Sequence, residues 1–286
     1  MSWITTHDLD AFTAAAGPFL RAEPAPHTVL LTVTASLDAA GLDRYGDGTP
    51  EFGWWRGPGG RVAGAFLYTP PFPLVLARMP DAAAVELAEL RAADGLPVPG
   101  VNAGRAAAEA FAAAWTARTG AAGTVEERHR LYRLGELVPP DPAPSGRARP
   151  ATEDDRDLLV DWTREFGAES GGGSGDPERA VADRLAYGGA TLWEDGGRPV
   201  SYAGVTRTVA GMVRVAPVYT PPPLRRRGYA AAVTAAVSSA APAAGAREVL
   251  LFTDLANPTS NALYQRLGYA PVEDHLVISF SGRTSS

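Results

Sequence analysis

The sequence predicts a mixed α/β fold built from two similar units, and three features support this prediction. An apolar segment at 211–219 runs through a proline-rich turn into an alanine-rich stretch at 229–240, the pattern of a strand followed by a helix. The segment 138–150 contains five prolines near the middle of the 286-residue chain. Two glycine turns, Gly59-Gly60 and Gly196-Gly197, each precede an apolar strand.

The proline-rich segment is predicted to be a linker between two domains. Proline fits neither a helix interior nor a central strand, so 138–150 is expected to separate a domain at 1–137 from a domain at 151–286. The glycine turns indicate that the two domains are a degenerate repeat of one α/β unit. An unrelated α/β domain at 1–137 is the alternative.

The first domain shows apolar segments and turns that predict strands followed by helices and a late strand. The expected elements are strands at 52–55, 62–68 and 74–78, helices at 81–94 and 103–119, and a strand at 124–134.

The second domain is predicted to begin with helices at 153–167 and 177–187, joined by a flexible glycine-rich loop at 168–176. Thr152 is the expected N-cap of the first helix, and Pro177 the first residue of the second. The remaining expected elements are strands at 190–194, 199–206 and 211–219, a helix at 229–240, a strand at 248–253, a helix at 259–267, and a pair of strands around 271 and at 275–280.

Residues 215–231 carry an anion-binding pattern. Three arginines at 225–227 and Gly228 directly precede the helix expected from 229. The first amides of a helix have no intrahelical partner and carry partial positive charge, so they can bind a polyphosphate that the arginines neutralise. Gly228 and Ala230 leave the backbone open to close approach. The segment therefore predicts a polyphosphate site.

The same segment resembles motif A of the GNAT superfamily of acyl-CoA-dependent N-acetyltransferases, which reads Arg/Gln-x-x-Gly-x-Gly/Ala. Arg225, Gly228 and Ala230 match the motif, and the element order over 149–280 is that of the family. The resemblance implies a GNAT fold, with two tandem GNAT-like domains and splayed central strands in the second. The first domain has Met79-Pro80-Asp81 at the corresponding place and is predicted to lack acyl-CoA binding.

The resemblance also implies acetyl-CoA as cofactor, with its pantetheine arm between the splayed strands. Pro217 fits this because it cannot donate a ladder hydrogen bond and predicts a bulge. The implied contacts are the backbone of Val218, Tyr219 and Thr220 for pantetheine, Arg225, Arg226 and Arg227 with the amides of Gly228, Tyr229, Ala230 and Ala231 for pyrophosphate, and Asn257 and Asn261 elsewhere on the cofactor. Strand packing is the alternative for Val218 and Tyr219, and helix capping for the two asparagines.

A second segment, 253–269, resembles the family signature in which asparagines precede a tyrosine and a glycine–aromatic pair. Asn261 and Tyr264 lie three residues apart and share a helix face, and Gly268 is expected to end the helix in a left-handed cap. The resemblance implies that Tyr264 is the general acid that protonates the departing CoA thiolate. A packed aromatic with a solvated hydroxyl is the alternative.

The implied reaction is direct attack of a primary amine on the acyl thioester in a ternary complex, which needs a base or a water relay to deprotonate the amine. Glu165, Glu169 and Asp254 are candidates, with a solvated carboxylate as the alternative for each. A small-molecule amine is the expected acceptor. The alternatives are a protein N-terminus or lysine, a CoA-binding regulatory protein without turnover, and an arginine-patch interaction protein.

Composition disfavours other classes of protein. A net charge of -6 and a pI of about 5.3 argue against a general nucleic-acid or anionic-membrane binder. Mean hydropathy is -0.08, and no apolar run approaches the ~18 residues of a membrane span, so a cytoplasmic monomer or homodimer is expected. Cysteine is absent and the four histidines lack metal-ligand spacing, so no metal site is expected.

Overall fold

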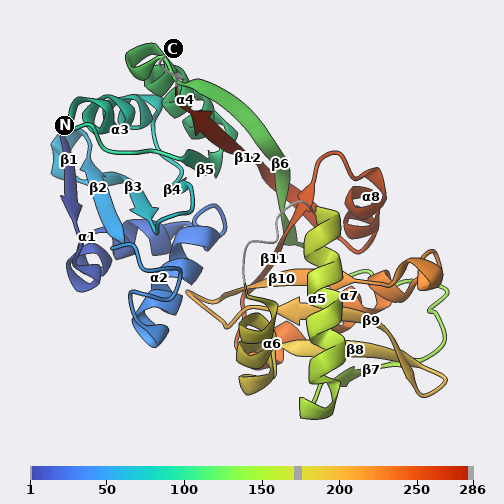
Figure 1. Cartoon of the computed structure of the whole chain (residues 1–286). Helices are drawn as coiled ribbons and strands as arrows, with labels where there is room; N and C mark the ends of the chain where they lie inside the picture. The colour runs from blue at the N-terminus through green and yellow to red at the C-terminus, as the bar shows by residue number, and fades with distance from the viewer. Residues whose placement is uncertain (1, 171–175, 283–286) are drawn as a thin grey trace. The chain divides into compact units, whose positions relative to one another are not determined.

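The computed structural model describes residues 2–170 and 176–282, which group into two compact units (Figure 1). Unit 1 holds the chain up to Leu131, Asp254–Ala256, and the described residues from Val272 onward. Unit 2 holds Tyr132–Thr253 and Asn257–Pro271. The units therefore divide the chain at Leu131, ahead of the expected linker, and the end of the expected second domain belongs to unit 1.

Unit 1 contains a mixed sheet. Its strands, in spatial order, are β1 (Ser2–Thr6), β2 (Glu51–Arg56), β3 (Val62–Tyr68), β4 (Leu74–Leu76), β5 (Gly100–Gly104), β12 (Tyr269–Ser281) and β6 (Ala122–Leu134). From β1 to β4 each neighbouring pair is antiparallel, whereas β4 and β5 are parallel, with Leu74 opposite Val101. β12 pairs antiparallel with β5, and His275 lies opposite Gly104.

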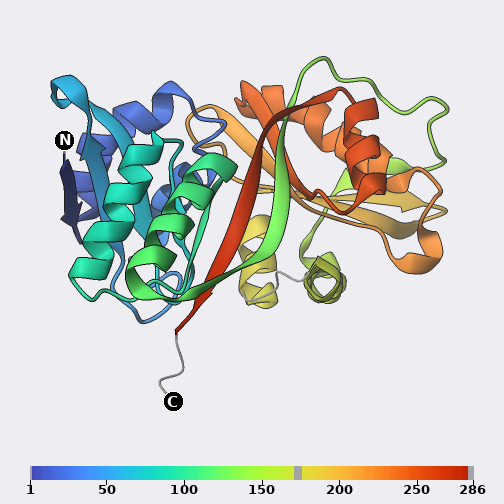
Figure 2. The same ribbon diagram turned by 90° about the horizontal axis from the view of Figure 1, so that it is seen from above.

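Helices cover both faces of this sheet (Figure 2). Helices α1 (Leu9–Ala22) and α2 (Thr28–Ala40) lie on one face, and α3 (Asp81–Ala93) and α4 (Arg105–Thr119) lie on the other. Neither α1 nor α2 is among the elements expected from the sequence. The expected helix at 103–119 begins only at Arg105, because its first residues complete β5.

Unit 2 repeats the arrangement. Its strands, in spatial order, are the end of β6, then β11 (Glu248–Asp254), β10 (Met212–Tyr219), β9 (Arg198–Val205), β8 (Ala190–Asp195) and β7 (Arg147–Pro150). The pairs from β7 to β10 are antiparallel, and β10 and β11 are parallel. Helices α5 (Arg156–Ser170) and α6 (Pro177–Ala186) lie on one face, and α7 (Tyr229–Ala240) and α8 (Pro258–Arg266) lie on the other.

In both units the first four strands are antiparallel and the fifth is parallel to the fourth. Two helices follow the first strand, and one helix follows each of the fourth and fifth strands. This shared order confirms the predicted α/β fold of two similar units. The units also share strands: β6 begins in unit 1 and ends in unit 2, and β12 begins in unit 2 and ends in unit 1.

Several expected boundaries in the second half differ from the structure. The last four residues of the expected linker form β7, which pairs with β8. The expected pair of strands at 271–280 is the single strand β12. A 3-10 turn at Glu153–Asp155 precedes α5, which continues to Ser170. Most of the loop expected at 168–176 lies outside the described residues.

Strand β7 is anchored by Arg149. Its guanidinium donates to the Asp155 carboxylate at 2.7 and 2.8 Å and to Glu194 Oε2 at 2.7 Å. The Asp155 carboxylate also accepts from the Thr152 amide at 2.9 Å, which completes a capping box with the predicted N-cap Thr152. The start of α5 is therefore fixed to the edge strand of its own sheet.

Among the helices of the described part of the chain, none is long and apolar enough to span a bilayer.

Candidate active site

Strand β10 contains the predicted bulge. Val215 lies opposite Val205 of β9 and Val218 lies opposite Ala203, with a register shift in between that contains Pro217. On its other side, β10 pairs with β11 only from Met212 to Arg214 among the described residues. Beyond Arg214 the parallel ladder stops, so the backbone of 215–219 has one paired side and one side left without a strand partner. This is the local geometry expected of splayed central strands.

The segment that follows, residues 220–228, is called the arginine loop. It contains a short 3-10 turn at Pro222–Leu224 and two left-handed residues, Arg226 with φ 63° and Gly228 with φ 85°. Gly228 is the N-cap of α7, and no side chain caps the helix. The first turn of α7 also contains no acidic residue. The amides at the start of α7 therefore keep their capacity to bind an anion.

The three arginines of the loop have different environments. The Arg225 guanidinium donates to both Glu169 oxygens at 2.7 Å, and its Nε donates to the Thr220 carbonyl at 2.8 Å. Arg226 and Arg227 are exposed, and the Arg227 guanidinium makes a long contact of 3.5 Å with the Pro223 carbonyl. Arg226 and Arg227 are thus the more available cations, and the contact of Arg225 with pyrophosphate stays a prediction.

Helix α5 supplies two carboxylates to the same region. Glu165 Oε2 accepts a hydrogen bond from the Tyr219 hydroxyl at 2.7 Å, and Glu169, one turn later, holds Arg225. Burial, together with the hydrogen bond to Glu165, raises the pKa of Tyr219 to about 12. Trp162 packs against Tyr219 with a ring-centroid distance of 6.1 Å. The end of α5 is therefore tied to the end of β10 and to the arginine loop.

Tyr229, predicted to contribute only its amide, also has a defined side-chain contact. The ring is buried, and its hydroxyl donates to Asp195 Oδ2 at 2.6 Å. Donation from the Tyr229 and Ser145 hydroxyls lowers the pKa of Asp195. Pro144 lies beside Gly228, since a Cβ added to Gly228 would lie 3.6 Å from it.

Helix α8 spans Pro258–Arg266, one residue earlier at each end than the helix expected at 259–267. Asn257 caps it by accepting a hydrogen bond from the Ser260 amide at 3.0 Å. Gly268 follows with φ 93°, and an added Cβ would lie 1.9 Å from the Glu136 carbonyl oxygen, so only glycine fits. The Asn261 side chain accepts from the Tyr132 hydroxyl at 2.9 Å and donates to the Asn257 carbonyl at 2.8 Å. The structure therefore gives both asparagines contacts that hold the helix, and their contact with a cofactor stays a prediction.

Tyr264 lies on α8, half-buried, with its ring against Tyr269 at a centroid distance of 6.0 Å. Burial raises the pKa of the Tyr264 hydroxyl. Among the described residues this hydroxyl has no hydrogen-bond partner, so its proton is not committed to a protein acceptor. The Tyr269 hydroxyl is instead paired with Ser238 at 2.7 Å.

The predicted residues gather around β10 from two faces of the sheet. Val218, Ala231 and Tyr264 pack against one core cluster, which also contains Tyr132 and Tyr269. Tyr219 belongs to a second cluster with Trp162, on the side of α5. Glu165 therefore lies with the α5 face and Tyr264 with the α7–α8 face.

Asp254, the third predicted catalytic residue, belongs to unit 1. Its carboxylate accepts a hydrogen bond from the Ala256 amide at 2.8 Å, which closes the turn after β11. A role for Asp254 as a base stays a prediction, and Glu165 is the carboxylate that the structure places against β10.

Comparison of the sequence with models of known protein families agrees with this geometry. The model of the acetyltransferase (GNAT) family matches residues 156–269, the stretch from the start of α5 to the first residue of β12. Residues 156–269 are a GNAT acetyltransferase domain. Proteins of the GNAT family transfer acetyl groups and use acetyl-CoA. The uncapped start of α7 suits phosphate groups, and the side of β10 left unpaired after Arg214 suits an extended arm.

Solved GNAT structures resemble the chain over its whole length. A GCN5-related N-acetyltransferase from Sphaerobacter thermophilus has TM-score 0.63 at 17% identity and covers 98% of this chain and 96% of its own. A GNAT-family acetyltransferase from Colwellia psychrerythraea has TM-score 0.59 at 11% identity, with coverages of 99% and 100%. A tandem GNAT protein from the clavulanic acid biosynthesis pathway has TM-score 0.52 at 15% identity, with coverages of 100% and 99%.

At these identities the likeness shows the fold alone. Together with the repeated strand order, it extends the GNAT fold from the matched domain to both units. Among curated proteins, no sequence matches the chain.

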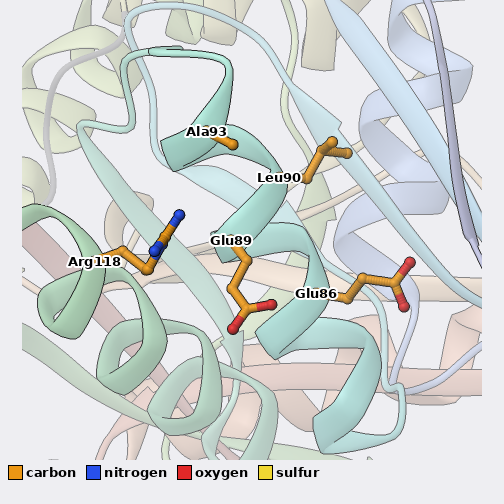
Figure 3. Close-up of a pocket in the computed structure, with 5 residues that line it drawn as sticks. All are labelled: Glu86, Glu89, Leu90, Ala93 and Arg118. Carbon is orange, nitrogen blue, oxygen red and sulfur yellow. The ribbon is translucent and has the colours of Figure 1, made fainter.

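A cavity of about 470 Å³ in unit 1 contains none of the predicted site residues (Figure 3). Glu86, Glu89, Leu90 and Ala93 of α3 and Arg118 of α4 line it. It is an open groove on two helices, with no nucleophile in its lining, so its volume gives it no role in acetyl transfer.

Two contacts of the site had no signal in the sequence. Tyr132 stands in a stretch of mixed apolar and charged residues that reads as an ordinary strand, and it pairs with a residue 129 positions later. Glu169 pairs with a residue 56 positions away. Neither contact belongs to a local pattern, and only the fold brings the partners together.

Proposed function

We propose that the chain is an N-acetyltransferase that moves the acetyl group of acetyl-CoA to the primary amine of a small molecule. The observation that carries the proposal is the uncapped N-terminus of α7 behind Gly228, at the end of a strand whose parallel ladder stops early. A helix start of this kind binds phosphate groups, and the unpaired side of β10 offers backbone groups to an extended pantetheine arm.

Binding rests on the arginine loop. The amides of Gly228, Tyr229, Ala230 and Ala231 face the pyrophosphate, and Arg226 and Arg227 neutralise its charge. Arg225, held by Glu169 and the Thr220 carbonyl, fixes the course of the loop. The backbone of Val218, Tyr219 and Thr220 contacts pantetheine.

Acetyl-CoA supplies an activated thioester when bound. Glu165 accepts the proton of the attacking amine, directly or through water, because the Tyr219 hydroxyl holds its carboxylate against the end of β10. The amine nitrogen forms a bond to the acetyl carbon, and the bond from that carbon to sulfur breaks. The Tyr264 hydroxyl donates its proton to the departing sulfur and is later reprotonated from solvent.

The raised pKa of Tyr264 suits this role. A hydroxyl with a pKa above its ordinary value stays protonated throughout the neutral and mildly alkaline range in which amines become nucleophilic. The Glu165 carboxylate and the negative net charge of -6 favour an acceptor that arrives as a cation.

Thiol release from acetyl-CoA, measured colorimetrically against a panel of small primary amines, tests the proposal. We expect amine-dependent release with at least one aliphatic amine, no release without amine, and an acetylated amine as the product by mass spectrometry. Acetyl-CoA binding without turnover on any amine, on lysine-containing peptides or on free peptide N-termini would instead support a CoA-binding regulatory protein.

A further inference from the structure

Tyr132 of β6 is a buried tyrosine whose hydroxyl links two residues of α8. The side chain is 0% exposed, and the hydroxyl donates to Asn261 Oδ1 at 2.9 Å and accepts from Gln265 Nε2 at 3.1 Å. Asn261 and Gln265 lie one helical turn apart and therefore share a face of α8. Tyr264 lies between Asn261 and Gln265 in the sequence. The two hydrogen bonds of the Tyr132 hydroxyl therefore hold the helical turn that contains Tyr264.

Helix α8 depends on such links for its orientation. It has nine residues, and none of them is fully buried. A helix this short is marginal in isolation, and its position must come from tertiary contacts. Leu263 and Tyr264 pack against the core but are only partly buried, so apolar contact alone restrains the rotation of α8 about its axis weakly. The Asn261 side chain also donates to the Asn257 carbonyl, which ties the Tyr132 link to the first turn.

We propose that Tyr132 is a positioning residue for Tyr264. Its hydroxyl fixes the rotation of α8, and with it the place from which the Tyr264 hydroxyl delivers a proton. This inference rests on the proposed acetyltransferase function and on the general-acid role of Tyr264. It also gives the first half of the sequence a part in the reaction, because Tyr132 precedes the proline-rich segment and yet belongs to unit 2.

A double-mutant cycle between Tyr132→Phe and Tyr264→Phe tests the proposal in the full-length chain. We expect Tyr132→Phe to lower kcat about tenfold, because the hydrogen bonds that hold α8 are lost. KM for acetyl-CoA should stay within about twofold of the wild type, because the cofactor site is intact. In the Tyr264→Phe background the same change should have no further effect on kcat.

Tyr187→Phe is the matched control, because the Tyr187 hydroxyl also makes a part-buried hydrogen bond in unit 2, to the Val205 carbonyl at 2.7 Å, away from α8. Its kcat should equal that of the wild type. Gln265→Met removes the other half of the link from an exposed position and should lower kcat about threefold without loss of folding.

Hydrogen exchange supplies a readout that does not depend on turnover. The amides of 262–266 should exchange at least tenfold faster in Tyr132→Phe, while those of α7 keep their rates. If the wild type turns over no amine and Tyr132→Phe still shows this faster exchange, the proposed function is wrong. The hydrogen bonds of Tyr132 are then structural only, and the positioning role is overturned. Equal kcat losses in both backgrounds, unchanged kcat in Tyr132→Phe, or unchanged kcat in Tyr264→Phe would each overturn it as well.

Discussion

Individual residues set the geometry of the arginine loop. Arg226 and Gly228 both have positive φ, and two left-handed residues so close together turn the chain sharply between β10 and α7. Glycine adopts this conformation without the cost of roughly 1–2 kcal/mol that a side chain adds. Gly228 is therefore needed for the backbone, whereas its near neighbour Pro144 leaves room for a methyl group.

Gly228→Ala should lower the free energy of unfolding by about 1 kcal/mol and raise KM for acetyl-CoA about tenfold, because the strained N-cap shifts the amides of α7. Gly60→Ala is the matched control: Gly60 has φ 75° and nothing within 4 Å of an added Cβ. It should cost a similar amount of stability and leave KM unchanged. Thermal unfolding and initial-rate kinetics measure both effects, and an unchanged KM in Gly228→Ala would contradict the assignment of the phosphate site.

Residues with a local reason for their place could be predicted from the sequence. Gly268 ends α8 as expected, Pro177 begins α6 and Thr152 forms the cap before α5, because capping depends on a few neighbouring residues. Side chains whose partners are distant in sequence could not be predicted. Arg225 shows this best, because no local pattern points to its pairing with Glu169, which lies 56 positions away in the sequence.

At the scale of elements, the edge strand β7 and the start of α5 depend on the buried carboxylate of Asp155. Its hydrogen bonds from Arg149, with further help from Thr152, lower its pKa to about 2. A carboxyl whose folded pKa is depressed stabilises the fold above its ordinary pKa, and this contribution is lost as pH falls toward the folded value.

Asp155→Asn should therefore lower the free energy of unfolding by about 1–2 kcal/mol at pH 7. The difference from the wild type should shrink between pH 4 and pH 2, as the wild-type carboxyl becomes protonated. Asp161→Asn is the control, because Asp161 is 69% exposed in its pair with Arg164 and should change stability by less than about 0.5 kcal/mol. Urea unfolding across this pH range measures both, and a difference that is independent of pH would contradict the role of the ionised carboxylate.

Elements with a strong apolar periodicity and clear turn or capping residues at their ends could be predicted. The strand at 62–68 and the helix at 229–240 have the boundaries expected from the sequence. Strand β7 falls within the expected linker because it has only four residues and ends in Pro150. A short edge strand tolerates proline where a central strand does not. The last two residues of β5 fall within the helix expected at 103–119, because Ala103 continues the alanine-rich pattern of α4.

At the scale of the whole molecule, the chain crosses between units where the sequence shows no boundary. β6 and β12 each contribute residues to both units, and β12 lies between β5 and β6 in the strand order of unit 1. The repeat of one α/β unit was visible from the glycine turns, but the exchange of strands was not. Sheet neighbours that lie more than 100 residues apart leave no local pattern, whereas a proline-rich segment does.

The two units differ where the phosphate site would lie. In unit 1 the helix after β4 is α3, whose N-cap is Pro80 and whose first turn contains Asp81. A carboxylate at this position repels a phosphate group. In unit 2 the corresponding helix is α7, with Gly228 as N-cap and no acid in its first turn. We therefore expect one acyl-CoA site in the repeat, in unit 2.

Calorimetric titration of the full-length chain with acetyl-CoA tests this central claim most directly. We predict one molecule bound per chain in the wild type, and affinity at least tenfold weaker in the Arg226→Ala/Arg227→Ala double variant, because two charge-assisted phosphate contacts are lost. Arg61→Ala, an exposed arginine of unit 1, should bind as the wild type does. Unchanged affinity in the double variant, or two equivalent sites per chain, would contradict the account.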